Sequence, residues 1–113
     1  MTPPSDILDR LFEVIEDRQR QRPADSYVVK LLDGGVPAIG AKICEEAEEV
    51  VDAAQSDDAE HLANEVADVL FHTWVMMAAK GVRPADVYSV LDARFGLGGL
   101  EEKRQRGGTD DAR

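Results

Sequence analysis

An all-α fold is predicted for this chain: an antiparallel bundle of four or five helices joined by short loops. Apolar residues recur at intervals of three and four along most of the chain, which is the spacing of one helix face. No stretch of useful length alternates between apolar and polar residues, as a half-buried strand would. Proline and glycine divide the chain into segments of helical length.

The first predicted helix has Ser5 as its candidate N-cap, because serine oxygens accept hydrogen bonds from the first free N–H groups. Its apolar face consists of Ile7, Leu8, Leu11, Phe12 and Ile15. Residues 26–32 are predicted to form one or two helical turns, which end at the glycines of Asp33-Gly34-Gly35. Pro37 is predicted to open the next helix, since proline suits the first turn. The apolar stripe of that helix is Ile43, Ala47, Val50, Val51 and Ala54.

A longer helix is predicted next, ending at Gly81, and Pro84 begins a last one. The apolar face of the longer helix is Leu62, Val66, Val69, Leu70, Thr73, Met76 and Met77. The face of the last helix is Val87, Val90, Leu91 and Phe95. A chain of 113 residues holds one modest core. We therefore expect a single domain over residues 1–106 and a disordered tail over residues 107–113.

The segment from Val69 to Ala79 is apolar on almost every side. A helix of this kind must be covered all round, and the few helices of a small chain can surround one of their own only partly. We therefore expect a homodimer or a higher homo-oligomer. The alternative is a well-covered central helix in a monomer.

The acidic composition excludes some classes of protein. Asp and Glu number 23 against 13 Lys and Arg, which gives a net charge of −10. Nucleic-acid binders carry basic patches and anionic membranes attract polybasic segments, so neither partner is expected. The single cysteine, Cys44, cannot form an internal disulfide, and the N-terminal residues do not resemble a signal peptide. A cytoplasmic location is expected.

Most of this charge lies in residues 36–68, which hold ten acids and one base. Within this segment Glu46 and Glu49 are three residues apart and share a helix face, and Glu65 and Asp68 repeat that spacing on the next helix. All four border the apolar stripes. If the two helices pack antiparallel, the two pairs can meet.

Carboxylates beside a core are costly unless something compensates their charge, and they cannot compensate one another. A bound cation is one solution, and oxygen ligands select Mg²⁺, with Mn²⁺ as a possible substitute. Such a cluster suits the hydrolysis of a phosphoanhydride. The alternative is an acidic helix face that is simply solvated.

Five segments, in this order, carry a resemblance to a known family. They are Arg22-Pro-Ala-Asp-Ser-Tyr, Lys30-Leu-Leu-x-Gly-Gly, Lys42-x-x-Glu-Glu-Ala, Glu65-x-Ala-Asp-Val-Leu-Phe-His72 and Arg94-Phe-Gly-x-Gly-Gly-Leu-Glu-Glu-Lys103. With the spacing E-E-x-x-E…E-x-x-D, the chain resembles the all-α nucleotide pyrophosphatases of the MazG-like superfamily. Within that superfamily it is most similar to the phosphoribosyl-ATP pyrophosphatases of histidine biosynthesis.

The resemblance implies Mg²⁺-dependent hydrolysis of phosphoribosyl-ATP to phosphoribosyl-AMP and pyrophosphate, by an enzyme that associates as a dimer or larger assembly. It implies that Glu46, Glu49, Glu65 and Asp68 are the metal ligands. Glu45 matches the first acid of the motif, and its implied role is to hold or deprotonate the attacking water.

Several other residues are candidates for binding the substrate. Lys42 could contact a phosphate or pair with Glu46 four residues later. Lys30, Arg94 and Lys103 are candidate phosphate contacts, or ordinary surface charges. His72 could hydrogen-bond the Asp68 carboxylate four residues earlier, or be a buried histidine with its bonds satisfied. We predict all five of these residues, Lys30, Lys42, His72, Arg94 and Lys103, as substrate-binding residues.

Two other functions remain open at this point. One is a house-cleaning pyrophosphatase that acts on free (deoxy)nucleoside triphosphates. The other is a non-catalytic helical interaction module whose acids are only a solvated face. Metal dependence separates the enzymes from the module, and substrate preference separates the two enzymes.

Overall fold

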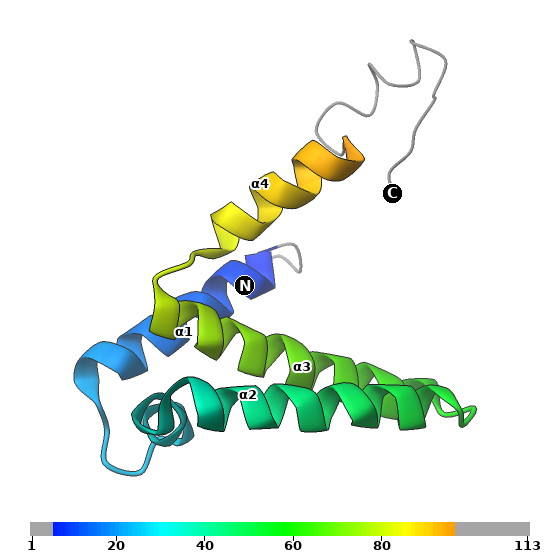
Figure 1. Cartoon of the computed structure of the whole chain (residues 1–113), viewed down its shortest axis with the longest axis horizontal. Helices are drawn as coiled ribbons and strands as arrows, with labels where there is room; N and C mark the ends of the chain where they lie inside the picture. Colours follow the sequence, from blue (N-terminus) through cyan, green and yellow to red (C-terminus); the bar gives the residue numbers. More distant parts are fainter. Residues whose placement is uncertain (1–5, 97–113) are drawn as a thin grey trace. The chain divides into compact units, whose positions relative to one another are not determined.

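The computed structural model describes residues 6–96, and within them the chain forms four helices and no strand. The predicted all-α class is therefore confirmed. The chain divides into two compact units, Met1–Val82 and Arg83–Arg113. The first contains α1, α2 and α3 (Figure 1). None of the described helices combines the length and the apolar character that are needed to cross a membrane.

Helix α1 (Ile7–Gln21) buries the predicted face only in part. Phe12 and Ile15 are buried, whereas Ile7 is 61% exposed. Asp6 occupies the N-cap position, but its side chain accepts no capping hydrogen bond, and the predicted cap Ser5 lies outside the described residues. The helix ends at Arg22, whose backbone N–H donates to the carbonyl of Arg18.

Helix α2 (Tyr27–Ala54) is interrupted near its start. The hydroxyl of Ser26 caps it by accepting a hydrogen bond from the N–H of Val29 at 3.3 Å. Gly35 then leaves the helical conformation with a φ of 73°, a left-handed value that favours glycine. Pro37 follows, and it has no N–H to continue the ladder. The two helical segments that the sequence predicts on either side of Gly35 are confirmed, and Figure 1 shows the first one end-on.

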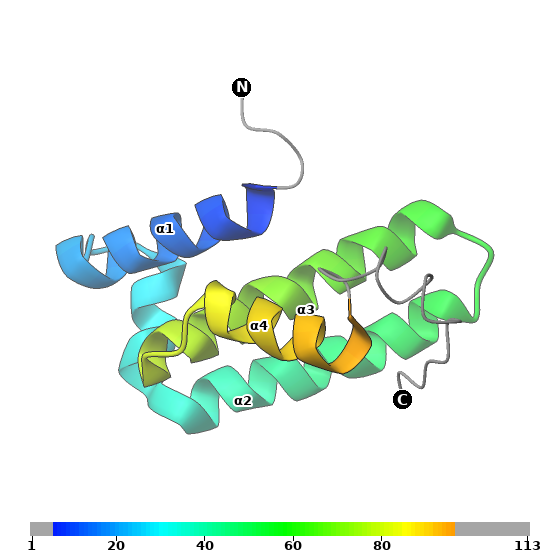
Figure 2. The same ribbon diagram turned by 90° about the horizontal axis from the view of Figure 1, so that it is seen from above.

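Helix α3 (Ala59–Lys80) returns antiparallel to α2 after a short turn. Asp58 caps it by accepting from the N–H of His61 at 3.1 Å, and Gly81 ends it with a φ of 74°. Figures 1 and 2 both show α2 and α3 side by side along most of their length, with α1 beside the end of the pair away from the turn. The indole N–H of Trp74 donates to the carbonyl of Leu8 at 3.0 Å and ties α3 to α1.

The core of the first unit lies where α1 meets the α2–α3 pair. Ile15, Ile39 and Val75, one from each helix, are its largest fully buried side chains. Nearer the turn, part of the predicted apolar stripe is exposed within this chain: Val51 is 58% exposed and Val66 is 40% exposed. The buried residues of α3 begin only at His72, because α1 covers that end of the pair and not the end near the turn.

The second unit contains α4 (Pro84–Phe95). As predicted, Pro84 stands at its first position. The N–H of Arg83 donates to the Asp86 carboxylate at 2.9 Å, and Gly96 ends the helix with a φ of 66°. The predicted tail of residues 107–113 lies outside the described residues, and the single domain over residues 1–106 stays a prediction.

Candidate metal and substrate site

Three of the predicted carboxylates gather on the α2–α3 pair. Glu46 and Glu49 project from α2 one turn apart, and Glu65 projects from α3. Each offers one carboxylate oxygen, and these three oxygens lie within 4.8 Å of one another. The antiparallel packing of the two helices brings them together, as the sequence predicts. We call these three residues the carboxylate trio.

The trio differs from an ordinary acidic surface because part of it is buried. Glu46 is only 8% exposed. Oxygen Oε1 of Glu46 and oxygen Oε1 of Glu65 are both buried and have no hydrogen-bond partner among the described residues. A buried acceptor without a partner costs about 1–3 kcal/mol, and more when it is charged. Two such oxygens on members of one carboxylate group would be satisfied by a positive ligand.

The electrostatics of the trio lead to the same conclusion. Burial in the first place, and then the negative charges of Glu49 and Asp68, raise the pKa of the Glu46 carboxyl from 4.5 to about 7. A hydrogen bond with the Glu65 carboxyl, followed by burial, raises the pKa of Glu49. Two carboxyl groups share a hydrogen bond only if one keeps its proton, so without a cation the trio resists full ionisation.

These residues could hold a hard divalent cation. All three ligands are carboxylate oxygens, which Mg²⁺ accepts through one or two protein groups while water fills its other positions. Among the described residues no cysteine joins the group, and the one histidine beside it, His61, is bound to Glu65: its Nε2 lies 3.2 Å from Oε2. The donor set therefore fits Mg²⁺ or Mn²⁺ better than zinc.

The remaining two motif acids lie at the edge of the trio. Asp68 is exposed and is not part of the group of three, although its charge acts on Glu46. Glu45 is exposed as well, and its Oε1 lies 3.3 Å from the ammonium of Lys42. That hydrogen bond is the main cause that raises the pKa of Lys42. Lys42 therefore pairs with Glu45, three residues away, and not with Glu46 as one of the predictions had it.

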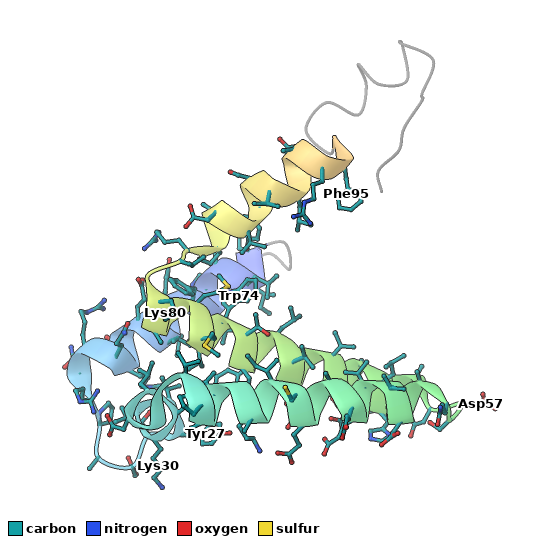
Figure 3. The ribbon with its side chains drawn as sticks, in the orientation of Figure 1. Tyr27, Lys30, Asp57, Trp74, Lys80 and Phe95 are labelled. Carbon is teal, nitrogen blue, oxygen red and sulfur yellow. The ribbon has the colours of Figure 1, made fainter. Side chains whose placement is uncertain are left out.

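The other predicted substrate contacts are spread over the chain. Lys30 is exposed on the first segment of α2, near Tyr27 (Figure 3). Arg94 is exposed on α4, in the second unit. Lys103 lies outside the described residues. The phosphate-binding roles of all three stay predictions.

His72 is held inside the protein by both of its ring nitrogens. It is 5% exposed, and its Nδ1 lies 2.9 Å from the backbone carbonyl of Asp68. Its Nε2 lies 2.9 Å from the hydroxyl of Tyr27. A carbonyl only accepts, so Nδ1 carries the proton that it donates, and a neutral ring then accepts from the tyrosine through Nε2. The partner is therefore the backbone of Asp68 and not its carboxylate, because a helical side chain points back toward the preceding turn.

Sequence reasoning missed two residues of this region. His61 could have been found, because it lies four residues before Glu65 on the same helix face. Tyr27 meets His72 across 45 positions of the chain. No local pattern indicates that contact, and only the packing of α2 against α3 creates it.

Comparison with known proteins identifies the family. Residues 8–95 match the family model described as phosphoribosyl-ATP pyrophosphohydrolase. The chain is 51% identical over 100 residues to the phosphoribosyl-ATP pyrophosphatase of Parvibaculum lavamentivorans, covering 88% of this chain and 92% of the relative. It is 46% identical over 91 residues to the protein of the same name from Sulfurisphaera tokodaii, covering 80% and 97%.

A third relative of that name, from Chromobacterium violaceum, is 42% identical over 106 residues, which cover 94% of this chain and 96% of the relative. The matched segment contains all of α2 and α3, and so the whole carboxylate trio. With a family model over most of its length and relatives of this similarity, the chain belongs to the phosphoribosyl-ATP pyrophosphohydrolase family.

Proposed function

We propose that this chain hydrolyses phosphoribosyl-ATP to phosphoribosyl-AMP and pyrophosphate, the second step of histidine biosynthesis, and that it uses Mg²⁺ to do so. The names of the relatives support the substrate. The observation that carries the chemistry is the pair of buried carboxylate oxygens, on Glu46 and Glu65, that have no partner among the described residues.

In this proposal Glu46, Glu49 and Glu65 hold the cation, and Asp68 adds its charge from the exposed side. When bound, Mg²⁺ neutralises phosphate oxygens and orients the group for in-line attack. It also answers an electrostatic difficulty. Residues 36–68 carry ten acids and one base, and a field of that sign repels a polyphosphate unless a cation reverses it locally.

Glu45 is the residue that we assign to the attacking water. It is exposed, it lies next to Glu46 in the chain, and Lys42 fixes one of its oxygens at 3.3 Å. Its carboxylate accepts a proton from water while the water oxygen forms a bond to phosphorus. The anhydride P–O bond breaks, and its electron pair leaves with the pyrophosphate. Lys42, Lys30, Arg94 and Lys103 are the candidates to balance the charge of the phosphates.

We also propose that the protein works as a homodimer or a larger homo-oligomer. The support is the exposure of Val51 on α2 and Val66 on α3, two apolar side chains of the predicted stripes near the turn. Exposed valine side chains on two adjacent helices are typical of a surface that another protein chain covers. Sedimentation velocity at micromolar concentration is expected to give at least the mass of two chains, and a monomer would contradict the proposal.

The reaction is tested by measuring pyrophosphate release from phosphoribosyl-ATP, ATP and dCTP under the same conditions. We expect turnover of phosphoribosyl-ATP and little of the other two. Equal turnover of dCTP would instead support the house-cleaning alternative. No release from any of them, with Mg²⁺ present, would contradict the enzymatic proposal.

A further inference from the structure

A pocket of about 520 Å³ lies in the first unit, between the end of α1 and the start of α2, and reaches α3. The residues that matter for its chemistry are Arg18, Asp25, Ser26, Tyr27 and Phe71. Its size is within the range of about 300–1,000 Å³ that is usual for small-molecule sites. None of these residues is among the carboxylates or the phosphate contacts discussed above.

One wall of the pocket is aromatic and fixed in place. The rings of Tyr27 and Phe71 are nearly parallel, with an interplanar angle of 19° and centroids 6.0 Å apart. The hydroxyl of Tyr27 is bound to the buried His72 at 2.9 Å, and the two rings are nearly perpendicular, with centroids 5.8 Å apart. Tyr27 nevertheless remains 47% exposed. A large aromatic ring that is fixed by these contacts and still faces solvent offers a preorganised face on which a ligand can stack.

Polar groups stand beside this wall. The Ser26 oxygen already accepts the capping N–H of Val29, so its own proton remains available to a ligand. Asp25 is exposed, and its carboxylate can accept hydrogen bonds from a ligand. An aromatic wall with a donor and an acceptor beside it matches a heterocyclic base, which has two apolar faces and a polar edge.

The pocket also lies within a few turns of the carboxylate trio along α3. Phe71 follows Asp68 by three residues and Glu65 by six, which at 1.5 Å per residue is about 4.5 Å and about 9 Å along the helix axis. His72, which holds Tyr27, is bonded to the backbone of Asp68 at 2.9 Å. A nucleotide whose base lies on the aromatic wall can therefore extend its phosphates toward the carboxylate trio.

From these observations we infer that the pocket binds the purine base of the nucleotide substrate, stacked on Tyr27 and Phe71 with its polar edge toward Ser26 and Asp25. This inference rests on the proposed function for the identity of the substrate. The pocket itself is argued from its shape, its aromatic wall and its polar groups. Tyr27 is then a binding residue, and His72 is a positioning residue that acts through it.

The test uses the full-length protein and adenosine, which carries the base but no phosphate. In metal-free buffer, adenosine is expected to shift the NMR resonances of the Tyr27 ring, which are assigned with Tyr27→Phe because the chain has only two tyrosines. Ribose 5-phosphate, which has no base, is expected to leave them unchanged. Tyr27→Ala should weaken adenosine binding about tenfold, and Tyr27→Phe, which keeps the ring, should weaken it less.

Two further variants make the test robust. Asp25→Asn keeps the size and shape of an exposed side chain, and it is expected to weaken adenosine binding even if Tyr27→Ala fails to fold. Asp57→Asn is the matched control, because Asp57 lies in the α2–α3 turn at the other end of the helix pair from Tyr27 (Figure 3). It should bind adenosine as the wild type does.

The outcome for the pocket is separable from that for the proposed reaction. In the reaction, Tyr27→Ala should raise KM for phosphoribosyl-ATP about tenfold and lower kcat less. If the wild type releases pyrophosphate but adenosine leaves the Tyr27 ring unchanged and Tyr27→Ala keeps its KM, the pocket assignment is overturned. If adenosine binds at Tyr27 while phosphoribosyl-ATP is not hydrolysed, the proposed reaction fails and the pocket assignment holds.

Discussion

Replacing Glu46 by glutamine should stabilise the metal-free protein at neutral pH. The pKa of the Glu46 carboxyl is raised from 4.5 to about 7, mainly by burial and then by the charges of Glu49 and Asp68. Since one pKa unit corresponds to about 1.4 kcal/mol, ionising Glu46 in the folded state costs at most about 3 kcal/mol. Solvent reaches the trio on the side of Asp68, and screening there reduces the cost to about 1–2 kcal/mol.

The direction of the pH dependence follows from this pKa. Between about pH 4.5 and about pH 7 the folded state holds a proton on Glu46 that the unfolded chain has already released. The contribution of Glu46 to the free energy of unfolding of the metal-free wild type therefore falls as the pH rises through this window. In a chain of this size, 1–2 kcal/mol corresponds to a decrease in Tm of about 4–8 °C.

Thermal melting of the wild type, Glu46→Gln and the control Glu48→Gln measures this effect, with and without millimolar Mg²⁺. Glu48 is an exposed acid on the same helix and is not part of the trio. We expect Mg²⁺ to raise the Tm of the wild type and of Glu48→Gln at pH above about 7, by mass action on the folded state. Glu46→Gln should lose the part of the pH dependence that Glu46 contributes and most of the Mg²⁺ effect. If it keeps both, the trio is not the cation site.

Three other variants test separate parts of the account. Asp68→Asn should strongly reduce pyrophosphate release while its circular dichroism spectrum and Tm stay near those of the wild type; full activity would remove Asp68 from the site. Gly35→Ala should lower the free energy of unfolding by about 1–2 kcal/mol in urea titrations, because alanine is strained at a φ of 73°; an unchanged midpoint would mean that the break in α2 can move. Ile39→Ala should cost about 2–5 kcal/mol in the same titrations, because Ile39 is fully buried between the helices; a loss below 1 kcal/mol would contradict the core described here.

Local rules were sufficient for much of the fold. The two glycines and Pro37 predict the break in α2, because glycine permits a left-handed φ and proline has no N–H with which to continue the helix. The i, i+3 spacing of Glu46 and Glu49 predicts the two members of the trio that one helix supplies. An antiparallel hairpin is the simplest way to bring Glu65 to them, and the structure has that hairpin.

Local rules failed where a contact or its absence depends on distant residues. Val51 and Val66 belong to the predicted stripes, but α1 does not reach them, so they are exposed in the single chain. The contact between Tyr27 and His72 depends on how the first segment of α2 is turned at Gly35. Lys42 forms its ion pair with Glu45 and not with Glu46, because the buried Glu46 carboxylate faces Glu65 across the helix pair.

The most direct test of the central claim is the rate of pyrophosphate release from phosphoribosyl-ATP as Mg²⁺ is titrated from zero, in the wild type, Glu46→Gln and Glu48→Gln. Glu46→Gln removes a ligand of the carboxylate trio, whereas Glu48→Gln removes a charge from the same helix outside it. The account predicts release that depends fully on Mg²⁺ in the wild type and in Glu48→Gln, and almost none in Glu46→Gln at any Mg²⁺ concentration. Equal rates for the wild type and Glu46→Gln, or release without any divalent cation, would contradict it.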